Sequence, residues 1–308
     1  VAPAHLDQPA GNAPAGGMST TTCLRHPDRV AGRRCTRCGR PACESCLVQA
    51  SVGSHCVECA RATKPDLRTR ARFWQAQRPA LVTYTLIVAN VAAFVILGLA
   101  YDLPGMLGGQ VTEAHLEYGL NSVFVQGEPV ESPITGQQFT DGQEWYRLVS
   151  SGFLHFGLIH LGFNLWFLYV LGSELEPILG RGKFALLYFA SLLGGSAGVL
   201  MVDPGAITAG ASGAVFGLMG AYAVGMWRNG VNPFSTGIGT LLIINLVLTF
   251  AFGNISIGGH LGGLVAGSVC GAVMLAPRYR PVPDWAKWAA PAAVGAASVI
   301  VSVVAAAA

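Results

Sequence analysis

Residues 260–277 read HLGGLVAGSVCGAVMLAP, and residues 212–227 read SGAVFGLMGAYAVGMW. Both segments are apolar, and glycines recur in them at four-residue spacing: Gly213, Gly217, Gly263, Gly267 and Gly271. Small residues at this spacing lie on one face of a helix and let two helix backbones approach closely within a membrane. The two segments therefore predict membrane helices that pack tightly.

The rest of the chain is similarly apolar. Of its 308 residues, 52% are hydrophobic and only 11% are charged, whereas roughly 25% of residues in soluble domains are charged. A membrane span needs about 20 residues, and shorter apolar runs suit helices packed inside a bundle. Working outward from the two segments, seven runs follow Pro79: 81–101, 155–172, 184–202, 212–227, 235–252, 260–277 and 288–304. The sequence predicts an all-α, polytopic membrane protein and excludes an ordinary soluble enzyme.

The part before the first run has a different composition. It holds 12 of the 19 Lys and Arg residues and seven of the eight cysteines. The net charge of +3 is too small by itself to indicate nucleic acid as a partner. We divide the chain into a disordered tail (1–22), a cysteine module (23–62), a basic juxtamembrane linker (63–79) and a transmembrane domain (80–308).

The charges also predict an orientation. The loop 102–146 holds seven acidic residues and no Lys or Arg, whereas the basic residues of the later loops fall on the side of the N-terminus. Cytoplasmic loops carry the excess of Lys and Arg. We therefore expect a multi-pass protein of the plasma membrane with its N-terminus in the cytoplasm and its C-terminus outside. Only Arg147 departs from this rule.

The cysteine module contains four pairs of metal-binding residue types, each pair separated by two residues. The pairs are Cys23 and His26, Cys35 and Cys38, Cys43 and Cys46, and Cys56 and Cys59. Eight such ligands are enough for two tetrahedral zinc sites. Disulfides are the alternative, but cytoplasmic thiols stay reduced, and seven is an odd number. We predict two structural Zn²⁺ ions and no metal in catalysis; the spacing leaves open whether the pairs combine sequentially or interleave.

Polar side chains inside a membrane are costly and mark functional sites. In the early turns of the second, fourth and sixth spans, four of them fall at a similar depth: His160, Asn164, Ser212 and His260. Ser212 with His260 as its base permits acyl transfer. His160, Asn164 and the backbone N–H of Ser212 could bind the oxyanion. No carboxylate lies at this depth, so we expect a dyad in which Phe216 orients His260.

Three motifs in this order resemble the rhomboid family of intramembrane serine proteases over residues 80–277. They are His155-x4-His160-x2-Phe163-Asn164, Gly210-Ala211-Ser212-Gly213 and Gly259-His260-x2-Gly263-x3-Gly267. The resemblance implies a six-helix core followed by an additional seventh helix. It also implies cleavage of membrane-protein substrates within or near their transmembrane segments, with Ser212 as nucleophile, His260 as base, and His160 and Asn164 at the oxyanion.

The cysteine module resembles a B-box-type zinc finger, an arrangement similar to that of actinobacterial rhomboids. This resemblance implies interleaved ligands, with Cys23, His26, Cys43 and Cys46 on one zinc and Cys35, Cys38, Cys56 and Cys59 on the other. A protein partner or a lipid surface suits a module tethered to the bilayer better than nucleic acid does.

Two other functions fit the composition. A catalytically silent, client-binding relative would not need both Ser212 and His260, and a transporter would need charged groups at mid-membrane. Among the remaining residues, we expect Cys270 to pack in the core. Glu174 and Glu176 are expected to be solvated or paired with Arg181.

Overall fold

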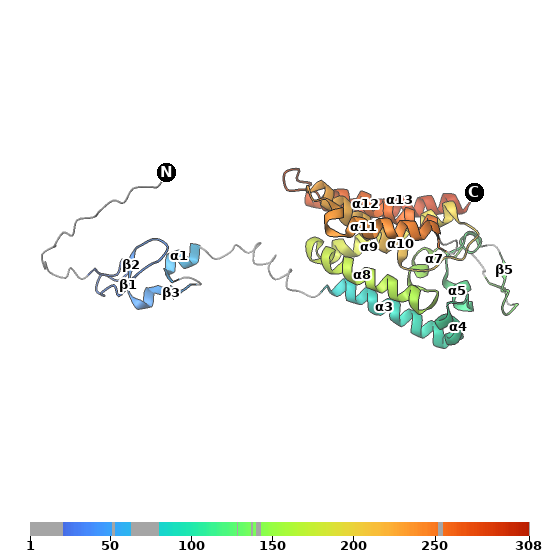
Figure 1. The fold of residues 1–308 in the computed structure, drawn as a ribbon, viewed down its shortest axis with the longest axis horizontal. Helices are drawn as coiled ribbons and strands as arrows, with labels where there is room; N and C mark the ends of the chain where they lie inside the picture. The colour runs from blue at the N-terminus through green and yellow to red at the C-terminus, as the bar shows by residue number, and fades with distance from the viewer. Residues whose placement is uncertain are drawn as a thin grey trace, which may run out of the picture. The chain divides into compact units, whose positions relative to one another are not determined.

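A computed structural model describes residues 21–50, 53–62, 80–127, 129–136, 138–139, 143–251 and 255–307. The described residues form two compact units, the cysteine module and a helical unit that spans 80–307, and each is treated separately below (Figure 1). The predicted tail lies outside the described residues apart from Thr21 and Thr22, and so does the predicted linker 63–79.

Short hairpins and turns make up the cysteine module. Its elements are β1 (Arg33–Arg34), β2 (Pro41–Ala42), a 3₁₀ turn (Glu44–Cys46), β3 (Leu47–Gln49), β4 (Ser54–Cys56) and α1 (Val57–Ala62). Strand β1 pairs with β2, and β3 pairs with β4, both antiparallel. Its buried cluster consists of Cys23, Cys43, Cys46 and Ala42. Four residues of this size bury little apolar surface, so the module has to be stabilised by something other than a hydrophobic core.

The helical unit confirms the predicted all-α membrane fold. Its helices are α3 (Leu81–Leu97), α4 (Leu103–Gly108), α5 (Glu113–Tyr118), α6 (Ser122–Gln126), α7 (Arg147–Ser150), α8 (Gly157–Leu179), α9 (Arg181–Val202), α10 (Ser212–Arg228), α11 (Ile238–Ala251), α12 (Ile257–Met274) and α13 (Asp284–Ala306). A π-helical turn, Gly98–Asp102, joins α3 to α4. Each of the seven predicted runs coincides with a helix, and the described residues contain five helices or joined helices long and apolar enough to span a membrane. The two shorter ones are α10, with 17 residues, and α11, with 14.

Glycines let α9, α10 and α12 pack backbone to backbone (Figure 1). A Cβ atom added to Gly263 would overlap the carbonyl oxygen of Gly213, and one added to Gly267 would overlap that of Gly217. Gly262 stands in the same relation to the carbonyl of Gly194 on α9. The predicted close packing of the two glycine-rich helices is therefore present, and it brings the start of α10 next to the start of α12.

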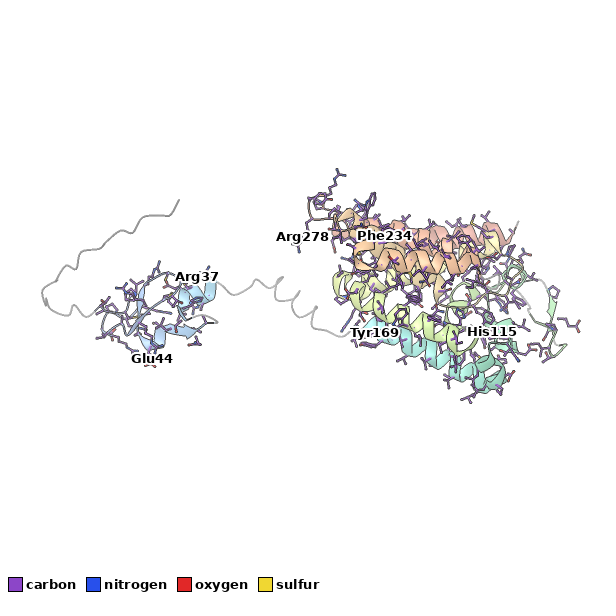
Figure 2. The ribbon with its side chains drawn as sticks, in the orientation of Figure 1. Arg37, Glu44, His115, Tyr169, Phe234 and Arg278 are labelled. Atoms are coloured by element: carbon purple, nitrogen blue, oxygen red, sulfur yellow. The ribbon has the colours of Figure 1, made fainter. Side chains whose placement is uncertain are left out.

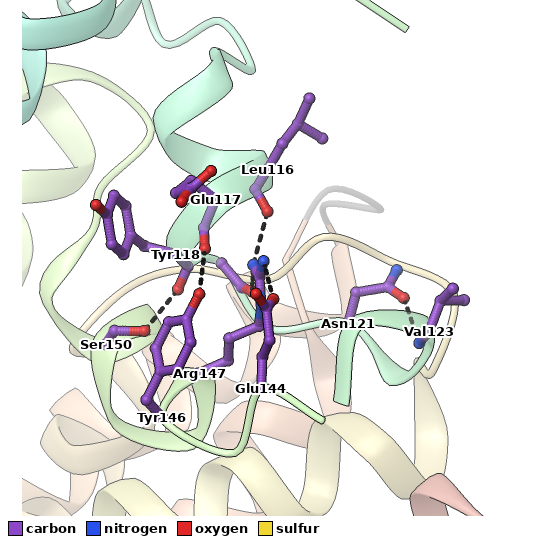
Figure 3. A network of polar contacts seen from close by, with 10 residues as sticks. Leu116, Glu117, Tyr118, Asn121, Val123, Glu144, Tyr146, Arg147 and Ser150 are labelled. Atoms are coloured by element: carbon purple, nitrogen blue, oxygen red, sulfur yellow. Dashed lines mark hydrogen bonds and ion pairs between the residues drawn. The ribbon is translucent and has the colours of Figure 1, made fainter. Parts of the chain in front are cut away.

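The predicted long loop is folded. Besides α4, α5 and α6 it contains a hairpin of β5 (Val130–Glu131) and β6 (Gln138–Phe139), and these elements gather at one end of the helical unit in Figure 1. Arg147, the exception to the charge rule, directly follows this loop and is 1% exposed. Its guanidinium donates to the carbonyls of Leu116 (2.6 Å) and Gly119 (2.9 Å) and to the carboxylate of Glu144 (2.6 Å) (Figure 3). Arg147 is therefore buried and paired rather than exposed at a membrane surface.

Glu176 corrects one expectation. It is 3% exposed and accepts hydrogen bonds from the backbone N–H groups of Val82 (3.0 Å) and Thr83 (2.8 Å) and from the Thr83 hydroxyl (2.8 Å). The first N–H groups of a helix lack partners within it, and a carboxylate is favoured there. Glu176 of α8 thus caps α3 instead of being solvated or pairing with Arg181.

Candidate active site

Three helices begin at one cavity of about 990 Å³. Ser212 is the first residue of α10, while His160 and His260 lie in the first turns of α8 and α12. All three line the cavity, together with Asn164 one turn further along α8. The structure thus brings together the four side chains that the sequence places at one depth.

The loop that leads into Ser212 is held by backbone hydrogen bonds to the folded loop before α8. The N–H of Gly210 donates to the carbonyl of Ser151 (2.8 Å), and Thr208 and Leu120 exchange two bonds of 2.8 and 2.9 Å. Gly210 has a φ of +130°, and a Cβ atom there would lie 2.9 Å from Nε2 of His160 and 3.7 Å from Oγ of Ser212. Only glycine leaves this space free between the two side chains.

A neighbouring backbone group determines the tautomer of His160. The N–H of Phe156 donates to Nδ1 of His160 (3.2 Å), so a neutral ring carries its proton on Nε2, which lies on the side of the ring that faces Gly210. Asn164 donates one N–H of its amide to the carbonyl of His160 (2.9 Å). His160 therefore presents a hydrogen-bond donor on the side where Ser212 lies.

His260 is held on its face and at its edge. Phe216 stacks on the imidazole, with ring centroids 4.0 Å apart and an interplanar angle of 20°. Nδ1 of His260 lies 2.7 Å from Oγ1 of Thr249, on α11. Within the described residues no hydrogen bond joins Ser212 to His260, and such bonds often tighten only when a substrate binds.

Thr249 was not predicted from the sequence. It is one of three threonines in the predicted fifth span, and a threonine in an apolar helix is unremarkable because its hydroxyl can bond to its own helix. The available signal was the pair Asn245 and Thr249, two polar residues four apart and so on one face of an otherwise apolar helix.

Two further histidines, neither with a predicted catalytic role, support the site. His155 is fully buried, and its Nε2 accepts the N–H of Ala211 at 3.5 Å. Its carbonyl accepts a hydrogen bond from Nε2 of His115 (3.3 Å), which stacks on Phe156. His115 is labelled in Figure 2, and its burial lowers its pKa. The residue that precedes Ser212 is thereby linked to the folded loop.

The cysteine module brings its predicted ligands together in two groups. Within each group the ligand atoms lie within 4.8 Å of one another, and the groups are Cys23, His26, Cys43 and Cys46, and Cys35, Cys38, Cys56 and Cys59. This is the interleaved arrangement, which spacing alone could not distinguish from the sequential one. Both groups could hold a metal ion.

The donor set and its spacing fit zinc. Zn–S bonds of about 2.3 Å in a tetrahedron place two sulfurs about 3.8 Å apart, and Sγ of Cys38 lies 3.8 Å from Sγ of Cys56. In the other group, Nδ1 of His26 lies 3.4 Å from the sulfur of Cys43 and 3.3 Å from that of Cys46. A hydrogen bond from Ser45, with a second contribution from His26, lowers the pKa of Cys43 to about 6, whereas burial raises the pKa of Cys46 in the same group to about 11.

Fold and cavity together define a multi-pass helical membrane protein whose polar side chains meet between helices. A family model described as a Rhomboid domain matches residues 142–277. The chain is 32% identical to the rhomboid protease GluP of Bacillus subtilis (strain 168) over 216 residues, which are 68% of this chain and 38% of that protein. It is 37% identical to the putative rhomboid protease YdcA of the same organism over 128 residues, 40% of this chain and 64% of that protein.

RHOMBOID-like protein 2 of Arabidopsis thaliana is 30% identical over 219 residues, which are 65% of this chain and 67% of that protein. The chain belongs to the rhomboid family. It spans less than two thirds of the length of either Bacillus relative.

Proposed function

We propose that the protein is an intramembrane serine endopeptidase that cleaves transmembrane segments of other membrane proteins, with Ser212 as nucleophile and His260 as general base. The observation that carries this proposal is that Ser212, His260, His160 and Asn164 line the same cavity. Rhomboid proteases among the relatives support the class of reaction.

In the proposed reaction, His260 takes the hydroxyl proton of Ser212 as Oγ attacks the scissile carbonyl carbon. The carbonyl oxygen becomes an oxyanion, which accepts hydrogen bonds from Nε2 of His160, from the second N–H of the Asn164 amide and from the backbone N–H of Ser212. That backbone group is free within the helix because Ser212 is its first residue. His260 then protonates the leaving amine, and water hydrolyses the acyl-enzyme with His260 again as base.

Cleavage of a model single-span substrate in liposomes tests the dyad. We expect Ser212→Ala and His260→Ala each to lower kcat by about four orders of magnitude or more, because the loss of either residue removes nearly all of the catalysis that the dyad provides. Ser235, an exposed serine outside the cavity, supplies the control Ser235→Ala, which should cleave normally. Cleavage that survives Ser212→Ala would overturn the mechanism, and an inactive wild type would favour a silent, client-binding protein.

We further propose that the cysteine module binds two structural Zn²⁺ ions, faces the cytoplasm and selects substrates or a protein partner there. The eight ligands in two closed groups support structural metal, because neither group keeps a ligand position open for water. The proposed orientation in the plasma membrane puts the C-terminus outside. A membrane-impermeant thiol reagent should then label an Ala307→Cys variant in intact cells, and protection of that thiol would contradict the orientation.

A further inference from the structure

Thr249 is unusual among the residues of α11. Along this helix only Gly239 and Thr249 are buried, and Thr249 is 1% exposed. Its hydroxyl makes two close contacts: Oγ1 lies 2.8 Å from the carbonyl of Asn245 and 2.7 Å from Nδ1 of His260. A threonine needed only for packing would not require a hydroxyl that contacts both of these atoms.

Counting protons settles the direction of these two bonds. A hydroxyl has one hydrogen and two lone pairs, and a carbonyl oxygen can only accept. The 2.8 Å contact between Thr249 and the carbonyl of Asn245 therefore contains the hydroxyl proton. Oγ1 then accepts the second bond, so Nδ1 of His260 carries the ring proton, and a neutral imidazole is left with Nε2 as its acceptor.

We propose that Thr249 is a positioning residue that holds His260 in the tautomer required of a base for Ser212, an inference that rests on the proposed function. Phe216 fixes the plane of the ring, and Thr249 fixes its rotation within that plane. A neutral hydroxyl takes the place that a carboxylate occupies in a catalytic triad, and it avoids the cost of a charge inside the membrane.

The two histidines of the cavity are consequently held in opposite tautomers. His160 receives the N–H of Phe156 on Nδ1 and presents Nε2–H as a donor. His260 gives its Nδ1–H to Thr249 and presents Nε2 as an acceptor. Histidine thus acts as a hydrogen-bond donor at position 160 and as a base at position 260. The group that contacts Nδ1 determines which of the two it is.

Kinetics of the full chain in liposomes test the proposal with three variants. Thr249→Val keeps the shape but removes the hydroxyl, Thr249→Ser keeps the hydroxyl, and Thr240→Val is the control at an exposed threonine on the same helix. We expect Thr249→Val to lower kcat about tenfold or more while KM stays within about twofold. Thr249→Ser should restore most of the loss, and Thr240→Val should have no effect.

A second measurement does not depend on the folding of a Thr249 variant. The ¹⁵N spectrum of histidine-labelled wild type, compared with that of His260→Ala, reports which nitrogen of His260 carries the proton at neutral pH. A proton on Nδ1 supports the proposal, and a proton on Nε2 overturns it. Unchanged kcat in Thr249→Val, with Ser212→Ala inactive, would also overturn it while leaving the proposed function intact; an active Ser212→Ala would instead overturn the proposed function.

Discussion

The cysteine module and the helical unit are each stabilised by different interactions. The buried cluster of the module consists of three cysteines and Ala42, and its ligand groups lie where two metal ions would bind. The helical unit has buried clusters rich in leucine and aromatic side chains, and glycines bring its helix backbones into contact. On the proposed zinc binding, the module would depend on metal ions for its stability, whereas the helical unit depends on the close fit of its side chains and backbones.

Metal removal should give the largest difference in stability between the two units. Structural zinc contributes about 10–16 kcal/mol in zinc-finger peptides, so a chelator should unfold the cysteine module and leave the helical unit folded. The cysteines report whether each unit is folded, because seven lie in the module and the eighth, Cys270, is fully buried in the helical unit. After chelation, maleimide labelling followed by mass spectrometry should show seven modified thiols and a protected Cys270.

The variant Cys43→Ser gives the same comparison without a chelator. We expect it to bind less zinc than wild type and to cleave a model single-span substrate at the wild-type rate. Labelling of Cys270 under either condition would show that the two units depend on each other. If the module selects substrates, the profile of native membrane proteins cleaved should also change, and an unchanged profile would contradict that role.

Some of this arrangement could be predicted because a local pattern carries it. Ser212, His260 and His160 each lie in the first turn of an apolar helix, and alternating spans predict that such turns fall at one depth. The ligand pairs of the module are likewise visible as spacing. Thr249 could not be placed in this way, since its contact with His260 depends on how α11 and α12 pack.

The folded loop before α8 was also beyond local reasoning. Its length and acidic residues predicted a loop, whereas its order comes from long-range partners of Arg147 and from pairing of Leu120 with Thr208. Arg147 stands out as an exception to the charge rule, and the resemblance to rhomboids implies that it holds a structured, partly membrane-embedded loop. An exception of this kind indicates a buried, paired charge, because an unpaired one would be costly.

Added volume between the helices should disrupt the helical unit and leave the module unaffected. A leucine at position 267 would overlap the backbone of Gly217, and overpacking of this kind typically costs about 1–3 kcal/mol or more. We expect Gly267→Leu to lower the temperature of thermal denaturation in detergent, to expose Cys270 to maleimide and to reduce cleavage. The zinc content should stay at the wild-type level.

The control for this substitution is Gly162→Leu on α8. Gly162 is exposed, and a Cβ atom there meets nothing within 4 Å. This variant should denature at the wild-type temperature. Equal effects of the two substitutions would show that close approach of α10 and α12 is not what stabilises the unit.

Acid should weaken the helical unit by a smaller amount through His115. Its Nδ1 accepts the N–H of Thr112 (3.2 Å), its Nε2 donates to the carbonyl of His155 (3.3 Å), and burial lowers its pKa. Because the folded-state pKa lies below the unfolded value of about 6.5, the unfolded chain takes up the proton first as the pH falls. The stability present above pH 6.5 is therefore lost as the pH falls towards the folded-state pKa, by at most about 1.4 kcal/mol per pH unit.

Thermal denaturation of wild type and His115→Gln in the same buffers isolates this contribution. The stability of wild type relative to the variant should be greater at pH 8 than at pH 5.5. A difference in stability that does not depend on pH would show that His115 does not titrate on unfolding.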